Sequence, residues 1–176
     1  MIHCPGCGFG FWHNWGVLVG MKPVNKLETI SGSSLAAVCY LCNLDPYVEV
    51  VKCNRIRYTL FFAPKKTIMA WLRVSLPHNC AQMCNKKLVI MLRKLPSLEL
   101  VYIDKWESKE DLIQSLIASI SILSVHKIDG TYYTDCIYVR PTHKLLSSKT
   151  VCFVPSMRTA ISLFEQGKTK GQKVNT

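Results

Sequence analysis

The sequence has little of what membrane-spanning or disordered chains contain. It has no run of about 18 or more consecutive apolar residues, the length that a helix needs to cross a bilayer. The apolar stretch Leu112–Val125 is short and is interrupted by serines. Charged residues make up only 19% of the 176 residues and hydrophobic residues 49%, a composition typical of a folded chain with a core. We therefore expect one compact domain without a membrane-spanning helix.

Acidic residues are also scarce. The 11 acidic residues stand against 22 basic ones, which gives a formal net charge of +11. This excess favours an anionic partner, namely lipid headgroups, nucleic acid or an acidic protein, although lysines also serve solubility alone. The N-terminus lacks a basic region followed by an apolar stretch, so we expect no secretory signal and a cytoplasmic protein.

Cysteine, in contrast, is abundant. The nine cysteines lie in apolar segments such as VCYLCNL and KTVCFVP, where a free thiol behaves as a small apolar side chain in a reducing compartment. Three pairs have the close spacing of zinc ligands: Cys4/Cys7, Cys39/Cys42 and Cys80/Cys84. Zinc knuckles usually occupy polar, glycine-rich turns, whereas Cys39 and Cys42 lie in a helix-like apolar run. We therefore predict neither a metal nor another cofactor.

Strand, loop and helix patterns alternate along the chain. In the first part, two strands each lead through a glycine-containing turn into a helix: Met1–Cys4 into Phe11–Met21, and Leu27–Ile30 into Leu35–Leu44. RIRYTLFFA has a β-like composition and is followed by a helix over Thr67–Val74. The later elements are paired strands at Lys87–Arg93 and Leu98–Asp104, a capped helix at Ser108–Leu123, a turn at Asp129-Gly130, a strand at Thr150–Val154 and a helix at Met157–Gln166. The alternation predicts a three-layer α/β/α sandwich with a mostly parallel sheet over residues 1–167, and a fraying, lysine-rich tail over 168–176.

A serine stands between the second strand and its helix in ISGSSLAAV. Ser34 fits a nucleophile elbow of the form G-x-S-x-G, with Gly32 in the first glycine position and Ala36 in the second. Serine–glycine clusters are also ordinary turns and helix caps. The motif by itself therefore leaves both interpretations open.

Three segments taken together favour the interpretation of Ser34 as a nucleophile. PGCGFGFWHNWGV, ISGSSLAAV and KIDGTYYTD occur in the order and context of patatin-like phospholipases, a family that includes adipose triglyceride lipase, and NKKLVIMLRK with WESKEDLIQSLIASISIL resembles its animal members. The resemblance covers nearly the whole chain. It implies a patatin-like fold, with a glycine-rich oxyanion loop, a serine elbow and a late Asp-Gly pair.

The resemblance assigns roles by position. The oxyanion loop falls on Gly6, Cys7 and Gly8, the nucleophile on Ser34 and its partner on Asp129, with Phe9, Gly32 and Gly130 supporting the motifs. The chain departs from the family pattern at three positions. The family usually has glycine at Phe11 and Ala36, and glycine or alanine at Thr131. In this dyad Asp129 accepts the Ser34 proton, and the loop amides stabilise the oxyanion.

A histidine-dependent mechanism is the alternative within the hydrolases. Only His143 follows Asp129, and it lies in the loop-like segment RPTHKLL, which disfavours a Ser-His-Asp triad. His13 stands beside Trp12 and Trp15 and is interpreted as structural.

The basic–aromatic segment RIRYTLFFAPKK has three interpretations. It fits a membrane-facing edge with Phe61, Phe62, Lys65 and Lys66, a nucleic-acid surface, or simply an apolar strand before a solvated turn. We predict a lipid acyl hydrolase that acts on phospholipid or acylglycerol in peripheral contact with a lipid surface, and we expect no specific nucleic-acid binding. The alternatives are a catalytically impaired protein that binds lipid or a protein partner, and a basic nucleic-acid module.

Overall fold

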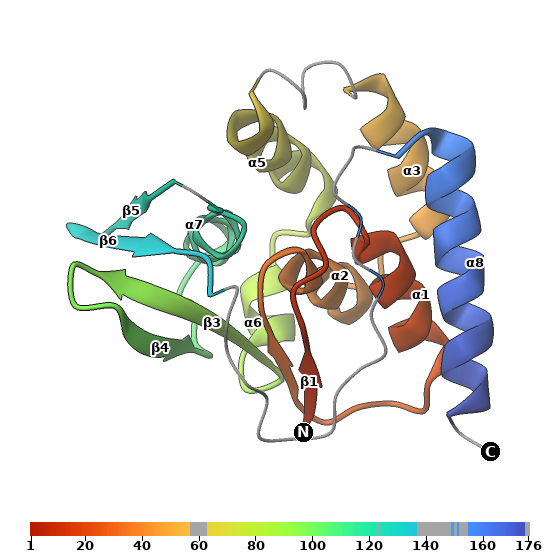
Figure 1. Cartoon of the computed structure of the whole chain (residues 1–176), viewed down its shortest axis with the longest axis horizontal. Helices are drawn as coiled ribbons and strands as arrows, with labels where there is room; N and C mark the ends of the chain where they lie inside the picture. Colours follow the sequence, from red (N-terminus) through yellow and green to blue (C-terminus); the bar gives the residue numbers. More distant parts are fainter. Residues whose placement is uncertain (57–62, 123, 137–148, 150, 152–154, 175–176) are drawn as a thin grey trace.

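The fold is built around a mixed β-sheet with helices packed beside it (Figure 1). The computed structural model describes residues 1–56, 63–122, 124–136, 149, 151 and 155–174. Its elements, in chain order, are β1 (Ile2–Cys4), α1 (Phe11–Gly20), β2 (Leu27–Thr29), α2 (Gly32–Leu41), α3 (Pro46–Arg55), α5 (Pro64–Ser75), α6 (Cys80–Cys84), β3 (Leu88–Leu95), β4 (Glu99–Ile103), α7 (Lys109–Ser119), β5 (His126–Ile128), β6 (Thr131–Thr134) and α8 (Met157–Lys173). The expected α/β class is confirmed, whereas the expected mostly parallel sheet is found only in its first three strands.

The sheet has a parallel part and an antiparallel part. Strands β1, β2 and β3 run parallel, whereas β4 and β6 pair antiparallel with β3 and β5 pairs antiparallel with β6. The strand order is β1-β2-β3-β6-β5, with β4 beside β3. The two glycine-containing turns both follow strands of the parallel part, so they meet at one edge of the sheet.

Several predicted elements are confirmed because local signals specify them. The two predicted neighbouring strands form the β3–β4 pair. Helix α7 begins with the expected capping box, in which the Ser108 side chain accepts a hydrogen bond from Asp111 N and the Asp111 side chain accepts one from Ser108 N. Helix α5 extends the predicted helix at Thr67–Val74 in both directions. The predicted strand Thr150–Val154, and Phe61 and Phe62, fall largely or wholly outside the described residues.

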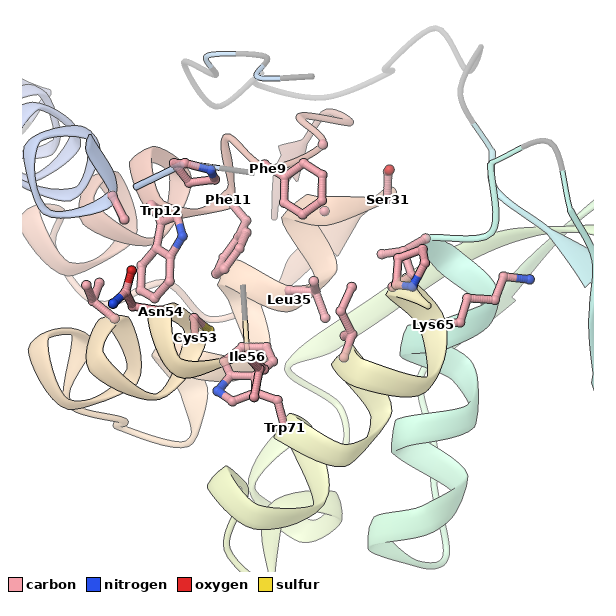
Figure 2. A pocket seen from close by; sticks show the side chains of 18 of the residues that line it. Phe9, Phe11, Trp12, Ser31, Leu35, Cys53, Asn54, Ile56, Lys65 and Trp71 are labelled. Atoms are coloured by element: carbon pink, nitrogen blue, oxygen red, sulfur yellow. The ribbon is translucent and has the colours of Figure 1, made fainter. Parts of the chain in front are cut away.

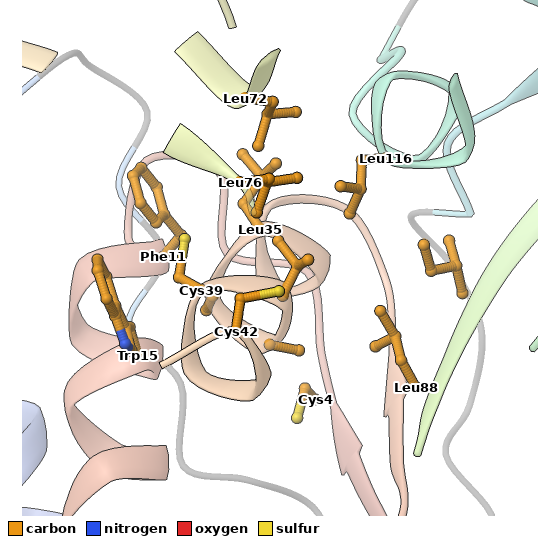
Figure 3. Close-up of a cluster of buried hydrophobic side chains, with 14 of the residues drawn as sticks. Cys4, Phe11, Trp15, Leu35, Cys39, Cys42, Leu72, Leu76, Leu88 and Leu116 are labelled. Carbon is orange, nitrogen blue, oxygen red and sulfur yellow. The ribbon is translucent and has the colours of Figure 1, made fainter. Parts of the chain in front are cut away.

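The hydrophobic core surrounds helix α2 (Figure 3). Trp15 from α1, Leu72 from α5 and Leu116 from α7 are fully buried in it. Cys39 and Cys42 lie on α2 among these apolar side chains, as expected for cysteines used as small core residues. Among the described residues, no helix combines the length and the apolar character needed to cross a membrane.

Helices α1 and α8 run side by side at unusually close range (Figure 1). A Cβ atom at Gly16 would lie 2.0 Å from the Phe164 carbonyl oxygen, and one at Gly171 would lie 2.2 Å from the Val17 carbonyl oxygen. Glycine therefore allows the two backbones to touch. This packing corrects the expected fraying tail at residues 168–176, because α8 continues to Lys173 and Gly171 is buried against α1.

Candidate active site

The loop after β1 lies directly against the turn after β2. Gly8 has a φ of +52°, a conformation that favours glycine, and its carbonyl oxygen lies 2.1 Å from the position that a Cβ atom at Gly32 would take. A Cβ atom at Gly6 would lie 3.4 Å from Ser31 Cβ. Any side chain at Gly32 would push the loop away, so the glycines keep the two turns in contact.

Ser31 occupies the sharp turn between β2 and α2. Its backbone has φ 56° and ψ −139°, and it forms no side-chain hydrogen bond that caps the helix. A positive φ at a residue other than glycine is strained and is often found at functional sites. A serine on a strained strand-to-helix turn has the backbone position of a nucleophile elbow, although only 4% of Ser31 is exposed.

Ser34, the predicted nucleophile, lies instead inside the first turn of α2. Its side chain is fully buried, and its Oγ is 3.0 Å from Thr29 Oγ1 and 2.9 Å from Ser119 Oγ. These contacts join β2, α2 and α7. The structure therefore gives Ser34 a structural position, with a hydroxyl that is already engaged in the core.

Asp129, its predicted partner, lies at the tip of the β5–β6 hairpin. Asp129 and Gly130 both have positive φ values, 45° and 83°, as a tight hairpin turn requires, which confirms the predicted turn. Both residues are exposed, and the hairpin projects away from α2 (Figure 1). The structure does not bring Asp129 and Ser34 together, because one lies on an exposed turn and the other in the core.

A different carboxylate faces the elbow. Asp135 follows β6 directly, at the opposite end of that strand from Asp129, and only 5% of it is exposed. Burial raises the pKa of Asp135 to about 6, and hydrogen bonding from the Ser31 hydroxyl and the Cys136 backbone partly opposes this rise. Neither carboxylate oxygen has a hydrogen-bond partner of standard geometry among the described residues. The Ser31 contact is thus a loose one, of the kind that often tightens only when substrate binds.

The glycine loop offers amide groups beside Ser31. The N–H groups of Gly6, Cys7 and Gly8 donate to no backbone carbonyl within the described part of the chain. The Phe9 N–H is already used, since it donates to the Val151 carbonyl at 2.9 Å. The predicted oxyanion residues therefore lie at the elbow, while Phe9 holds the loop in place.

Ser33 fastens this loop to α2. Asn14 Nδ2 donates to Ser33 Oγ at 2.7 Å, and Ser33 Oγ in turn contacts the Pro5 carbonyl and Cys7 Sγ, the latter at 3.3 Å. Burial raises the pKa of Cys7 to about 12, so its thiol is neutral and is not a nucleophile. Ser33, Asn14 and Cys7 form a buried support under the loop.

An apolar cavity of about 300 Å³ opens beside Ser31. We call it the acyl cavity. Ser31 and Lys65 lie on one side of it and Trp12 and Asn54 on the other (Figure 2). Phe11, Leu35, Ile56 and Trp71 lie between these two sides. The size is at the lower end of the range for small-molecule sites, which is roughly 300–1,000 Å³, and the apolar lining fits a hydrocarbon chain.

Histidine takes no part in the described site. No histidine within the described residues forms a hydrogen bond with Asp135. His13 is buried on α1, where burial lowers its pKa, in keeping with a structural role. His143 lies outside the described residues.

Ser31 and Asp135 do not stand in the motif positions that the neighbouring glycines mark. Gly32 drew the serine assignment to Ser34, and Gly130 drew the acid assignment to Asp129. Strands β2 and β6 run in opposite directions along β3, where Thr29 pairs with Ile90 and Thr134 pairs with Arg93. The residues that follow the two strands therefore approach each other across the middle of β3, a register that no local signal in the sequence specifies.

No protein-family model matches this chain, and the search of curated proteins also finds no match.

Proposed function

We propose that the protein is a serine acyl hydrolase that cleaves carboxylic esters of lipids, with Ser31 as nucleophile and Asp135 as general base. One observation carries the proposal: Ser31 lies on a strained turn in the wall of an apolar cavity, and its hydroxyl contacts the buried carboxylate of Asp135. Phospholipids and acylglycerols both present an apolar acyl chain beside an ester. Peripheral contact with a lipid surface from the cytoplasm would supply either.

The chemistry needs two steps. Asp135 accepts the Ser31 proton as Oγ attacks the ester carbonyl carbon, and the amides of the glycine loop stabilise the resulting oxyanion. Collapse of this intermediate expels the alcohol, which takes the proton from Asp135. Water, deprotonated by Asp135, then attacks the acyl-enzyme, and the fatty acid leaves as Asp135 returns the proton to Ser31 Oγ.

The resemblance to patatin-like phospholipases supports the glycine loop and the order of the elements, whereas Ser31 and Asp135 lie outside the G-x-S-x-G and Asp-Gly motifs. The glycine loop, the elbow and a late aspartate occur in the family order, and the parallel part of the sheet places the first two side by side. Two of the departures from the family pattern, Phe11 and Ala36, are buried in α1 and α2, and Thr131 begins β6. We propose a patatin-like three-layer fold on this basis.

The decisive experiment is covalent labelling with a fluorophosphonate probe, combined with release of fatty acid from phosphatidylcholine micelles and triacylglycerol emulsions. Labelling of the wild type and loss of labelling in Ser31→Ala are expected, with Ser34→Ala as the matched control that still reacts. No labelling and no fatty-acid release from either substrate would contradict the proposal.

The second candidate is a lipid-binding protein without turnover. The loose contact between Ser31 and Asp135 favours it, because a general base acts only within hydrogen-bond reach. This candidate predicts fatty-acid binding in the acyl cavity by a protein that no fluorophosphonate labels.

A further inference from the structure

The acyl cavity shares a wall with a second hollow on the outside of the molecule. This outer groove, of about 480 Å³, is lined by Ala63, Ala70 and Val74, together with Lys52, Lys66 and Thr67. Two further residues, Ile56 and Trp71, line both the groove and the acyl cavity. They are therefore the partition between the two spaces.

Trp71 is held firmly in this partition. Its indole N–H donates to Glu49 Oε2 at 2.6 Å, and only 2% of Glu49 is exposed. The same carboxylate accepts hydrogen bonds from Lys52 Nζ at 2.6 Å and Ser75 Oγ at 2.5 Å. A buried carboxylate with three donors fixes its partners strongly, so the ring has one orientation.

The groove beyond the partition is open and largely apolar. Val74 is 77% exposed, and Ala70 is also exposed, so this side of α5 presents apolar surface to solvent. A hydrocarbon chain that passed the partition would meet apolar side chains there. Lys52 and Lys66 stand beside it with their own apolar stems.

We infer that Trp71 and Ile56 form the chain-length stop of the acyl cavity, and that opening this partition lets a longer acyl chain run into the outer groove. The inference rests on the proposed function for the orientation of the chain, with its carboxyl end at Ser31. It makes Trp71 and Ile56 specificity-determining residues for the acyl group.

Hydrolysis of p-nitrophenyl esters, compared from butyrate to palmitate, tests this directly. In the wild type, kcat/KM should rise by up to about fourfold per added methylene until the cavity is full, and then stop rising. Trp71→Ala and Ile56→Ala should move this limit to longer chains. Trp71→Phe keeps a wall, and Val74→Ala changes only the groove, so both should keep the wild-type limit. An unchanged limit in both opened variants overturns the inference.

Binding separates this inference from the catalytic proposal. In a Ser31→Ala background, saturated fatty acids of increasing length are titrated against a bound fluorescent fatty acid. Adding Trp71→Ala or Ile56→Ala should extend the chain length at which affinity stops improving. If wild-type protein hydrolyses no ester but this extension is observed, the proposed function fails and the chain-length stop stands. Ile56→Ala leaves the Glu49 hydrogen bonds intact, so the test does not depend on the folding of Trp71→Ala.

Discussion

The two ends of strand β6 show how differently one residue type behaves in this protein. Asp129, before the strand, lies on an exposed hairpin tip where its positive φ serves the turn. Asp135, after the strand, is buried beside Ser31, and its pKa is raised to about 6. Burial, rather than the motif in which the aspartate occurs, raises the carboxylate pKa toward neutrality, which is why we propose Asp135 and not Asp129 as the base.

Helix α2 offers the same comparison for serine. Ser31 precedes the first turn and has a strained backbone. Ser34 lies within that turn, and its hydroxyl contacts the hydroxyls of Thr29 and Ser119. Both serines are buried, so the two positions differ in the partners of their hydroxyls, since the Ser31 hydroxyl contacts Asp135 instead.

The largest effect is expected from replacing Ser31 rather than Ser34. Ser31→Ala removes the nucleophile and should lower kcat by a factor on the order of 1,000 or more, measured as fatty-acid release. Ser34→Ala should keep most activity and cost about 1 kcal/mol of unfolding free energy, because Thr29 and Ser119 retain other hydrogen bonds, to the Val89 and Ser31 carbonyls. The reverse pattern would restore Ser34 as the nucleophile.

The next largest effect is expected from replacing Asp135 rather than Asp129. Asp135→Asn keeps the shape of the side chain but removes the base, so turnover should fall by a factor on the order of 100 or more. Asp129→Asn should leave turnover nearly unchanged, since asparagine suits a turn position with positive φ. Equal losses in both variants, at equal thermal stability, would argue against this assignment.

The sequence predicted elements that depend on neighbouring residues. The capping box of α7 and the β3–β4 pair each follow from signals within one segment. The dyad could not be predicted in the same way, because Ser31 and Asp135 meet only through the packing of β2, α2 and β6, and a positive φ at a serine has no signature in the sequence. The end of α8 was missed for a related reason. Its lysines suggest a tail, but Gly167 and Gly171 let the helix pack against α1.

The pH dependence of activity tests whether Asp135 is the general base. A base must be ionised to accept the Ser31 proton, so kcat/KM should rise with pH and level off above the pKa of about 6, falling about tenfold per pH unit below it. The raised pKa also means that the folded state binds a proton that the unfolded chain has lost. Relative to Asp135→Asn, unfolding free energy should therefore decrease as pH rises from the unfolded pKa, about 4, through 6. A kcat/KM profile that is flat down to pH 4 would exclude Asp135 as the base.

A smaller loss of activity than at Ser31 or Asp135 is expected beneath the loop, at Ser33. Ser33→Ala removes the hydroxyl that links Asn14 to the Pro5 carbonyl and leaves the Asn14 amide buried without this acceptor. Unfolding free energy should fall by about 1–3 kcal/mol, the usual cost of a buried polar group that loses its partner.

The effect of Ser33→Ala on activity depends on how far the loop amides move. Because Gly8 remains packed against Gly32, the loop should shift little, and kcat should fall only several-fold while KM stays nearly constant. Denaturant titration and steady-state kinetics on the same preparation measure both quantities. Asn14→Ala is the matched variant: it breaks the same hydrogen bond but keeps the Ser33 contact to Pro5, so it should lower kcat less than Ser33→Ala does. If Asn14→Ala lowers kcat more, the loop is positioned from α1 rather than from α2.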